Sequence, residues 1–307
     1  MLWKRMNKPF LWLTALLAAD FLAGTRAWAY TPEIHQQLTF IAARQYNHCM
    51  QDSAQHERLS ALDTRYIVKA NVAQADTNLF VRMFRWNYYN PADQSNRSAW
   101  WLVETRFHGH FAELAEQLDS SERKRKRLQT LGKLLTYIQK VSSPPHAVPV
   151  FTGRWWRFSM SDRFNRFPVD ADAVEQAVES ACEGLIRPDD SLQRLLIDAA
   201  NETLAAVKSP IAGFPATWES YWELAAEAGD FGEYGRAGNS FGERTEFRCD
   251  GERCLLLKDD PLYAEFALQR HVAAVIASMR AIALMQSTPR PPEPELNVVQ
   301  GEARPNP

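Results

Sequence analysis

The feature that most constrains the fold is a long run of apolar residues at helical spacing between Pro261 and Met285. Its apolar side chains recur mostly three or four positions apart, at Tyr263, Phe266, Val272, Val275, Ile276, Met279 and Ile282. This recurrence is typical of an α-helix that packs one face against other elements. The chain is 46% hydrophobic, which is enough for one substantial core. The sequence therefore predicts a fold built mainly from helices.

Further helices are expected along most of the chain, and two of them carry recognisable start signals. Thr31 precedes Pro32, a helix cap followed by proline at the first helical position. Asp119 and Glu122 resemble a capping box. The expected helices cover about residues 31–50, 59–85, 105–118, 119–141, 171–186, 191–208, 216–228 and 261–285. The glycine-rich stretch at about 229–260 is expected to be an insertion with a small β-hairpin, so the predicted fold is an all-α, multi-helix bundle with this insertion.

The two ends of the chain differ in composition from the expected bundle. Residues 1–29 place Lys4, Arg5 and Lys8 before an apolar run and end in Ala-Trp-Ala, the pattern of a cleavable secretory signal; an uncleaved anchor is the alternative. Residues 288–307 are rich in proline and poor in apolar residues, so we expect a disordered tail. The expected layout is a signal peptide at 1–29, one helical domain at 30–287 and the tail, with cleavage at about Ala29 and a periplasmic or secreted product.

The net charge argues against general nucleic-acid binding. Residues 1–29 carry a net charge of +3 and the whole chain −2, so the 278 residues expected after cleavage carry −5. A mildly acidic surface gains nothing overall from attraction to phosphates.

All four cysteines lie in the part expected to be exported, and an even count in an oxidising compartment favours two disulfides. Cys249 and Cys254 stand on either side of Asp250-Gly251, which predicts a disulfide across a hairpin turn. The pair Cys49–Cys182 follows only by elimination. Metal binding by the close pair is the alternative, but no second pair or nearby histidine completes four ligands.

The stretch "LLTYIQKVSSPPHAVPV", residues 134–150, carries the main functional indication. A helical run ends at two prolines and is followed at once by His146. This stretch resembles the central motif of the zinc-dependent phospholipase C superfamily, which includes the single-strand-specific zinc nucleases. Its members carry His-x-x-x-Asp on a helix, then five residues, then His, whereas this chain has Thr136-x-x-x-Lys140 and then His146.

Other landmarks of the superfamily follow in order over residues 30 to about 170. The resemblance implies that the α-amino group of Tyr30, freed by cleavage, and the side chain of His35 are metal ligands. It implies Asp76 as a further ligand and places Asn87 where the superfamily has a histidine.

The last two ligand positions of the resemblance fall on Ser161 and Asn165, within a residue or two, and Asp162 lies close by. The resemblance also implies a helical bundle of the phospholipase C type.

Most of the implied ligand side chains are replaced, which changes the expected chemistry. Tyr30, His35, Asp76 and His146 remain as metal-ligand candidates, whereas Asn87, Thr136, Lys140, Ser161 and Asn165 stand at substituted positions. Zinc prefers imidazole, thiolate and carboxylate. An ammonium at Lys140 would also stand where two dications belong, and like charges at that separation repel strongly. We therefore expect at most one zinc, or none, with the Lys140 amine paired to Asp76 and bonded to the Thr136 hydroxyl.

Three interpretations of His146 stay open: one ligand of a residual zinc, a general base acting with Asp76, and a structural remnant. Next to the motif, Arg154, Trp155 and Trp156 are candidates for a pocket mouth or a membrane contact, since adjacent tryptophans cannot both face the core of one helix. A packed aromatic loop is the alternative.

The leading hypothesis for function is an exported, non-catalytic relative that binds a lipid headgroup or a phosphate-bearing ligand, with peripheral membrane contact. The alternative is an active, zinc-dependent phosphodiesterase with a reduced metal site. A third hypothesis is an interaction protein that acts through the 229–260 insertion.

Overall fold

The computed structural model describes residues 30–51, 57–76, 89, 98–99, 103–104, 107–148, 150, 161–185, 187, 189–227 and 232–287. These residues are mostly helical, as expected. The longer helices are α2 (Pro32–Cys49), α3 (Ala61–Ala75), α5 (Phe107–Ser120), α6 (Lys124–Val141), α9 (Leu192–Lys208) and α10 (Pro261–Ser287). Shorter helices are α7 (Pro144–Ala147) and α8 (Ala171–Val178), with single 3₁₀ turns at Phe164–Arg166, Glu179–Cys182 and Trp218–Ser220.

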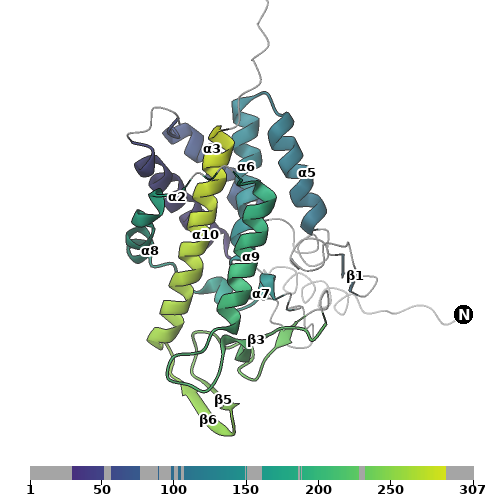
Figure 1. Ribbon diagram of the computed structural model, residues 1–307, viewed down its shortest axis with the longest axis vertical. Coiled ribbons are helices and arrows are strands. Elements are labelled where there is room, and N and C mark those ends of the chain that lie inside the picture. Colours follow the sequence, from purple (N-terminus) through teal and green to yellow (C-terminus); the bar gives the residue numbers. More distant parts are fainter. Residues whose placement is uncertain are drawn as a thin grey trace, which may run out of the picture.

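The helices pack around α6, which contacts α3, α5, α9 and α10. In Figure 1 these helices run side by side, and α8 lies at one flank beside α2 and α10. Residues 134–148, which span the end of α6 and all of α7, are buried without interruption. The stretch that carries the functional indication therefore lies in the core of the molecule.

Helices α3 and α6 approach closely at Gly132. A Cβ atom there would clash with the carbonyl oxygen of Ile67 and lie 3.0 Å from the Cβ of Ala70. The glycine thus permits the close packing of α3 against α6.

Several helix ends follow local sequence signals. Thr31 caps α2 and accepts a hydrogen bond from the Ile34 backbone N–H at 3.4 Å. Ser60 and Asp63 form a capping box at the start of α3 that the sequence analysis overlooked. The capping box expected at Asp119 is wrong, because α5 continues through Ser120 and α6 starts after Arg123 without a side-chain cap.

Two other expected helices differ in the structure. The helix expected over 59–85 is observed as α3 up to Ala75, with Asp76 as its C-cap, and residues 77–88 lie outside the described residues. The helix expected over 216–228 is wrong. Residues Trp218–Ser220 form a 3₁₀ turn and β3 (Trp222–Glu223) pairs antiparallel with β4 (Glu233–Tyr234), so strand pairing overrides the helical pattern.

The insertion contains the expected hairpin. Strands β5 (Thr245–Cys249) and β6 (Glu252–Leu256) are antiparallel, with Phe247 opposite Cys254. They lie below the helices in Figure 1, next to the start of α10. A further short pair, β1 (Ser98–Ala99) with β2 (Val103–Glu104), is also antiparallel.

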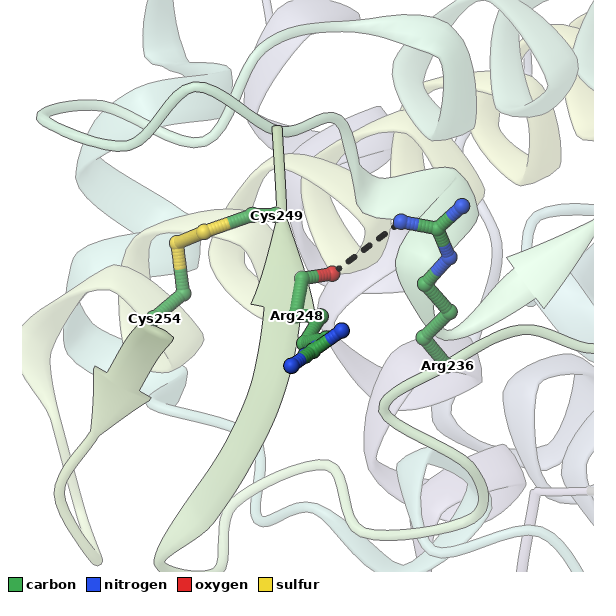
Figure 2. Close-up of a disulfide and its surroundings, with 4 residues drawn as sticks. All are labelled: Arg236, Arg248, Cys249 and Cys254. Atoms are coloured by element: carbon green, nitrogen blue, oxygen red, sulfur yellow. Dashed lines mark hydrogen bonds between the residues drawn. A yellow bond between two sulfur atoms is a disulfide. The ribbon is translucent and has the colours of Figure 1, made fainter. Parts of the chain in front are cut away.

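Both expected disulfides are present. Cys249–Cys254, shown in Figure 2, has a Cα–Cα distance of 5.9 Å and closes the hairpin whose turn contains Asp250-Gly251. On β5, next to Cys249, the Arg248 carbonyl accepts a hydrogen bond from Nη1 of Arg236 at 3.4 Å. Cys49–Cys182, at 5.1 Å, ties the end of α2 to the turn after α8.

Among the helices of the described part, none combines the length and the apolarity that a membrane span requires. The expected signal segment and the tail lie outside the described residues.

Candidate functional site

Seven of the sequence-derived ligand positions are buried. Ser161 is described below with the insertion, and the other six are Tyr30, His35, Thr136, Lys140, His146 and Asn165. They come from the segment just before α2, from α2, α6 and α7, and from the turn at Phe164–Arg166. Together with Gln139 they are called the buried frame below. Asn87, Arg154, Trp155 and Trp156 lie outside the described residues.

His35 is fully buried and is oriented by α6. Its Nδ1 lies 2.6 Å from Oε1 of Gln139. Because an amide oxygen only accepts, Nδ1 carries the proton and Nε2 presents a lone pair. Nε2 has no hydrogen-bond partner among the described residues. Burial lowers the pKa of His35 to about 3; the bond to Gln139 opposes this shift, and the positive charges of Lys140 and His146 add to it.

Gln139 connects four helices. Its amide nitrogen donates to Thr39 Oγ1 of α2 at 2.9 Å and to Ser278 Oγ of α10 at 3.3 Å. Its amide oxygen, besides His35, lies 3.2 Å from the side-chain amide of Asn71 on α3. The side chain next to Lys140 in the motif thus holds the bundle together.

Thr136 is also used in helix packing. Its hydroxyl donates to the Asn71 carbonyl at 3.1 Å and meets the Asn71 side-chain amide at 3.1 Å. A bond to the Lys140 amine was expected from the sequence, whereas the contacts of this hydroxyl join α6 to α3.

His146 faces the turn at Phe164–Arg166. Its Nε2 lies 3.4 Å from Nδ2 of Asn165, whose Oδ1 accepts a hydrogen bond from Ser143 Oγ at 2.6 Å. The Asn165 carbonyl accepts from the Thr31 backbone N–H at 3.2 Å. Asn165 therefore ties His146 to the chain segment that starts at Tyr30.

Tyr30 is buried beside two histidines. Its ring centroid lies 5.8 Å from that of His35 and 5.6 Å from that of His271. Burial raises the pKa of the Tyr30 hydroxyl, and the positive charge of Arg270 opposes the shift. The resemblance placed Tyr30 near His35, and the structure brings them into contact.

Lys140 has only 1% of its surface exposed, and Nζ lies 5.8 Å from the centroid of the Tyr137 ring. Its positive charge contributes to the lowered pKa of His35. Asp76 lies exposed at the end of α3, and no ion pair joins it to Lys140 in the described part of the chain. The expected partnership of these two residues is not formed.

Ser161 and Asp162 anchor the insertion. Ser161 Oγ accepts from Arg166 Nε at 3.1 Å. The buried Asp162 carboxylate accepts from Trp222 Nε1 and Tyr234 Oη, both at 2.9 Å, and from the Phe164 backbone N–H at 2.8 Å. Burial raises the pKa of Asp162, and these hydrogen bonds oppose the shift.

This donor set does not fit a three-zinc centre. The substituted positions Thr136 and Asn165 are bound to protein groups, Asp76 is at the surface and a buried ammonium adjoins the frame. Within the described ranges, no group of three or more His, Cys, Asp or Glu side chains is arranged to hold a metal ion. The described nitrogen ligands amount to His35 Nε2 and the His146 imidazole.

Sequence reasoning missed the residues that fill the frame, namely Thr39, Asn71, Gln139 and Ser278. A signal was present, because each is a polar residue on the apolar face of an expected helix and full burial of such a group requires a partner. The sequence indicated Asp162 only as a residue close to the last ligand positions, whereas its buried carboxylate accepts hydrogen bonds from Trp222, Tyr234 and the Phe164 backbone.

A scan against family models found no match to this chain. Searches of curated proteins and of solved structures likewise found none.

Proposed function

We propose that this chain is an exported relative of the zinc-dependent phospholipase C superfamily whose metal centre has been replaced by an internal polar network. In this proposal the protein binds a phosphate-bearing ligand, a lipid headgroup or a soluble phosphate ester, without hydrolysing it. The proposal includes a signal peptide at 1–29 and a bundle of the phospholipase C type.

The observation that carries the proposal is the pairing of His35 with Gln139 beside a buried Lys140. In the superfamily motif the position of Lys140 holds a carboxylate that bridges metal ions. Here Lys140, a cation of the protein, acts on His35, and the Gln139 amide oxygen accepts a hydrogen bond from one ring nitrogen of that histidine. Because a fixed positive charge disfavours a nearby dication, this arrangement supports a site without the metal cluster that phosphodiester hydrolysis would use.

The test compares binding with hydrolysis. The protein beginning at Tyr30 is mixed with phosphatidylcholine vesicles, with vesicles that also contain phosphatidic acid, and with soluble glycerol 3-phosphate. We expect saturable binding in at least one arm and no release of phosphorylated headgroups. The variant Lys140→Met should weaken binding, whereas the control Lys126→Met, at an exposed position of the same helix, should not.

One observation favours the second candidate, a hydrolase with a reduced metal site. The Nε2 lone pair of His35 has no partner within the described residues, and the neutral imidazole is the form that binds metals. Hydrolysis of phosphodiesters that disappears with a chelator and returns with zinc would support this candidate and contradict the first.

A further inference from the structure

A second site lies outside the buried frame, where the insertion meets the segment before α8. Three stretches enclose a hollow of about 390 Å³: residues 161–168, residues 241–243 and residues 258–259. Two of these stretches, residues 241–243 and 258–259, directly precede β5 and α10 in the chain. Its volume lies in the range of small-molecule sites.

Two cations of the hollow form no ion pair within the described residues, although the positive charge of Arg166 also acts on the buried Asp162 carboxyl and opposes the rise of its pKa. Arg163 forms an ion pair with Glu243. Arg166 and Lys258 form no ion pair with any residue that the structure describes. Asp259 is the remaining acid of the lining, so the hollow keeps a net positive charge.

Arg166 is held in place by its neighbour. Its Nε donates to Ser161 Oγ at 3.1 Å, which fixes the plane of the guanidinium. The two Nη groups are then the donors that suit a bidentate grip on two oxygens of an anion. The Phe167 ring lines the hollow beside them and offers an apolar surface.

The walls are fixed by hydrogen bonds between the insertion and the 161–168 segment. The Asn239 side chain accepts from the Arg163 backbone N–H at 2.8 Å and donates to the Ser161 carbonyl at 3.0 Å. The Glu243 carbonyl accepts from Tyr263 Oη at 3.0 Å and from Thr245 Oγ1 at 2.9 Å. Because these walls are already fixed, binding a ligand costs little conformational entropy of the protein, which favours binding.

The turns at Gly242 and Asp259, which also line the hollow, are joined to each other by a hydrogen bond. Gly242 has φ +82°, and a Cβ there would lie 3.2 Å from the Phe167 ring. Asp259 has φ +57°, and its backbone N–H donates to the Gly242 carbonyl at 3.4 Å. These left-handed residues bring Lys258 and Asp259 to the same hollow as Arg166.

We propose that this hollow binds a small phosphate-bearing ligand, with Arg166 gripping two phosphate oxygens and Lys258 supplying a second positive charge. Asp259 sets an upper limit to the charge of the ligand, since it repels polyanions. The site goes beyond the proposed function, because it uses neither His35 nor Lys140 and exists only through the insertion.

The test is calorimetric titration of the protein beginning at Tyr30 with inorganic phosphate and with glycerol 3-phosphate at low ionic strength. We expect saturable binding that weakens about tenfold in Arg166→Gln and in Lys258→Gln, as for the loss of one charge-assisted contact. The matched control Arg194→Gln removes the same charge from an exposed position on α9 and should leave binding unchanged. Asp259→Asn should tighten phosphate binding severalfold, and asparagine tolerates the left-handed backbone.

Four results would overturn the proposal: no saturable binding of either compound or of phosphatidic acid vesicles, unchanged affinity in Arg166→Gln, an equal loss in Arg194→Gln, or loss in Lys140→Met alone. The last result would remove this site while supporting the buried frame as the ligand site. Titration with phosphatidic acid in phosphatidylcholine vesicles identifies the source of the phosphate. Binding of vesicles but not of glycerol 3-phosphate would assign a membrane lipid, and the reverse would assign a soluble ester.

Discussion

The buried histidines predict a steep loss of stability in mild acid, and His271 provides the cleanest test. His271 is 1% exposed on α10, its ring lies 5.6 Å from Tyr30 and 6.2 Å from Phe164, and its Nε2 has no hydrogen-bond partner among the described residues. Burial lowers its pKa from 6.5 to about 3. The imidazole therefore stays neutral in the folded protein at pH values where the unfolded chain already binds a proton.

The sign and size of the effect follow from this difference in proton uptake. Above pH 6.5 neither state is protonated at His271, so the residue has no pH-linked effect. Between pH 6.5 and 3 the unfolded state binds the proton, so the free energy of unfolding falls by about 1.4 kcal/mol per pH unit. At pH 4.5 the loss from His271 is about 3 kcal/mol, a large part of the stability of a typical domain.

The perturbation is His271→Phe, which keeps a ring among the neighbouring aromatic side chains and removes the titrating group. We expect the free energy of unfolding at pH 7 to change by less than about 1 kcal/mol, because aromatic volume is kept and no described partner of Nε2 is lost. The assay is urea unfolding at pH 7, 5.5 and 4.5. His48→Phe, at an exposed position on α2, is the matched control. An acid slope in His271→Phe that equals that of the unmodified protein would refute the reasoning.

Three further predictions concern packing and anchoring. Gly132→Ala should lower the free energy of unfolding by about 3 kcal/mol or more, since its Cβ has no room against α3. Gly109→Ala on α5 meets nothing within 4 Å and should raise the free energy of unfolding by up to about 1 kcal/mol, so equal melting temperatures of the two variants would contradict the packing argument. Replacing both cysteines of Cys49–Cys182 by alanine should lower the free energy of unfolding by about 5 kcal/mol, because this disulfide closes a loop of 133 residues. The same change at the hairpin disulfide should lower it by about 2 kcal/mol, and a larger loss there in denaturant unfolding would be inconsistent with the loop argument. Asp162→Asn should lower the free energy of unfolding by about 3 kcal/mol, because a neutral amide replaces the carboxylate that accepts hydrogen bonds from Trp222 and Tyr234. Hydrogen exchange should also rise in β3 and β4, and unchanged exchange would argue against the anchoring role.

The elements that could be predicted from the sequence are those with strong local signals. The apolar period of residues 261–285 predicts α10, and Thr31-Pro32 predicts the start of α2. Asp250-Gly251 between two cysteines predicts the hairpin and its disulfide. In each case the information lies within a few turns of chain.

The elements that could not be predicted depend on contacts between distant residues. Residues 216–228 have a helical pattern, yet the indole of Trp222 bonds to Asp162, sixty positions earlier, and the segment becomes a strand. The end of α6 could be placed from its sequence, but the role of Gln139 depends on Thr39, Asn71 and Ser278, which lie on three other helices.

The resemblance grouped His35, Lys140 and His146 in one candidate site. All three side chains are buried in the core, and their role as a ligand site stays a prediction. The spacing also suggested Asp76 as the partner of Lys140, but α3 ends at Ala75 and leaves Asp76 at the surface. A motif fixes positions along helices, whereas the direction of a residue at a helix end depends on where that helix stops.

The central claim is that an internal polar network with a buried lysine has replaced the zinc centre, and metal content tests it most directly. The protein should be purified with Tyr30 confirmed as its first residue, incubated with excess zinc, passed through gel filtration and measured by elemental analysis. The account predicts no zinc retained in stoichiometric amount. One or more zinc ions held per chain would contradict it, place the Lys140 ammonium away from the frame and make the metal-dependent hydrolase the better explanation.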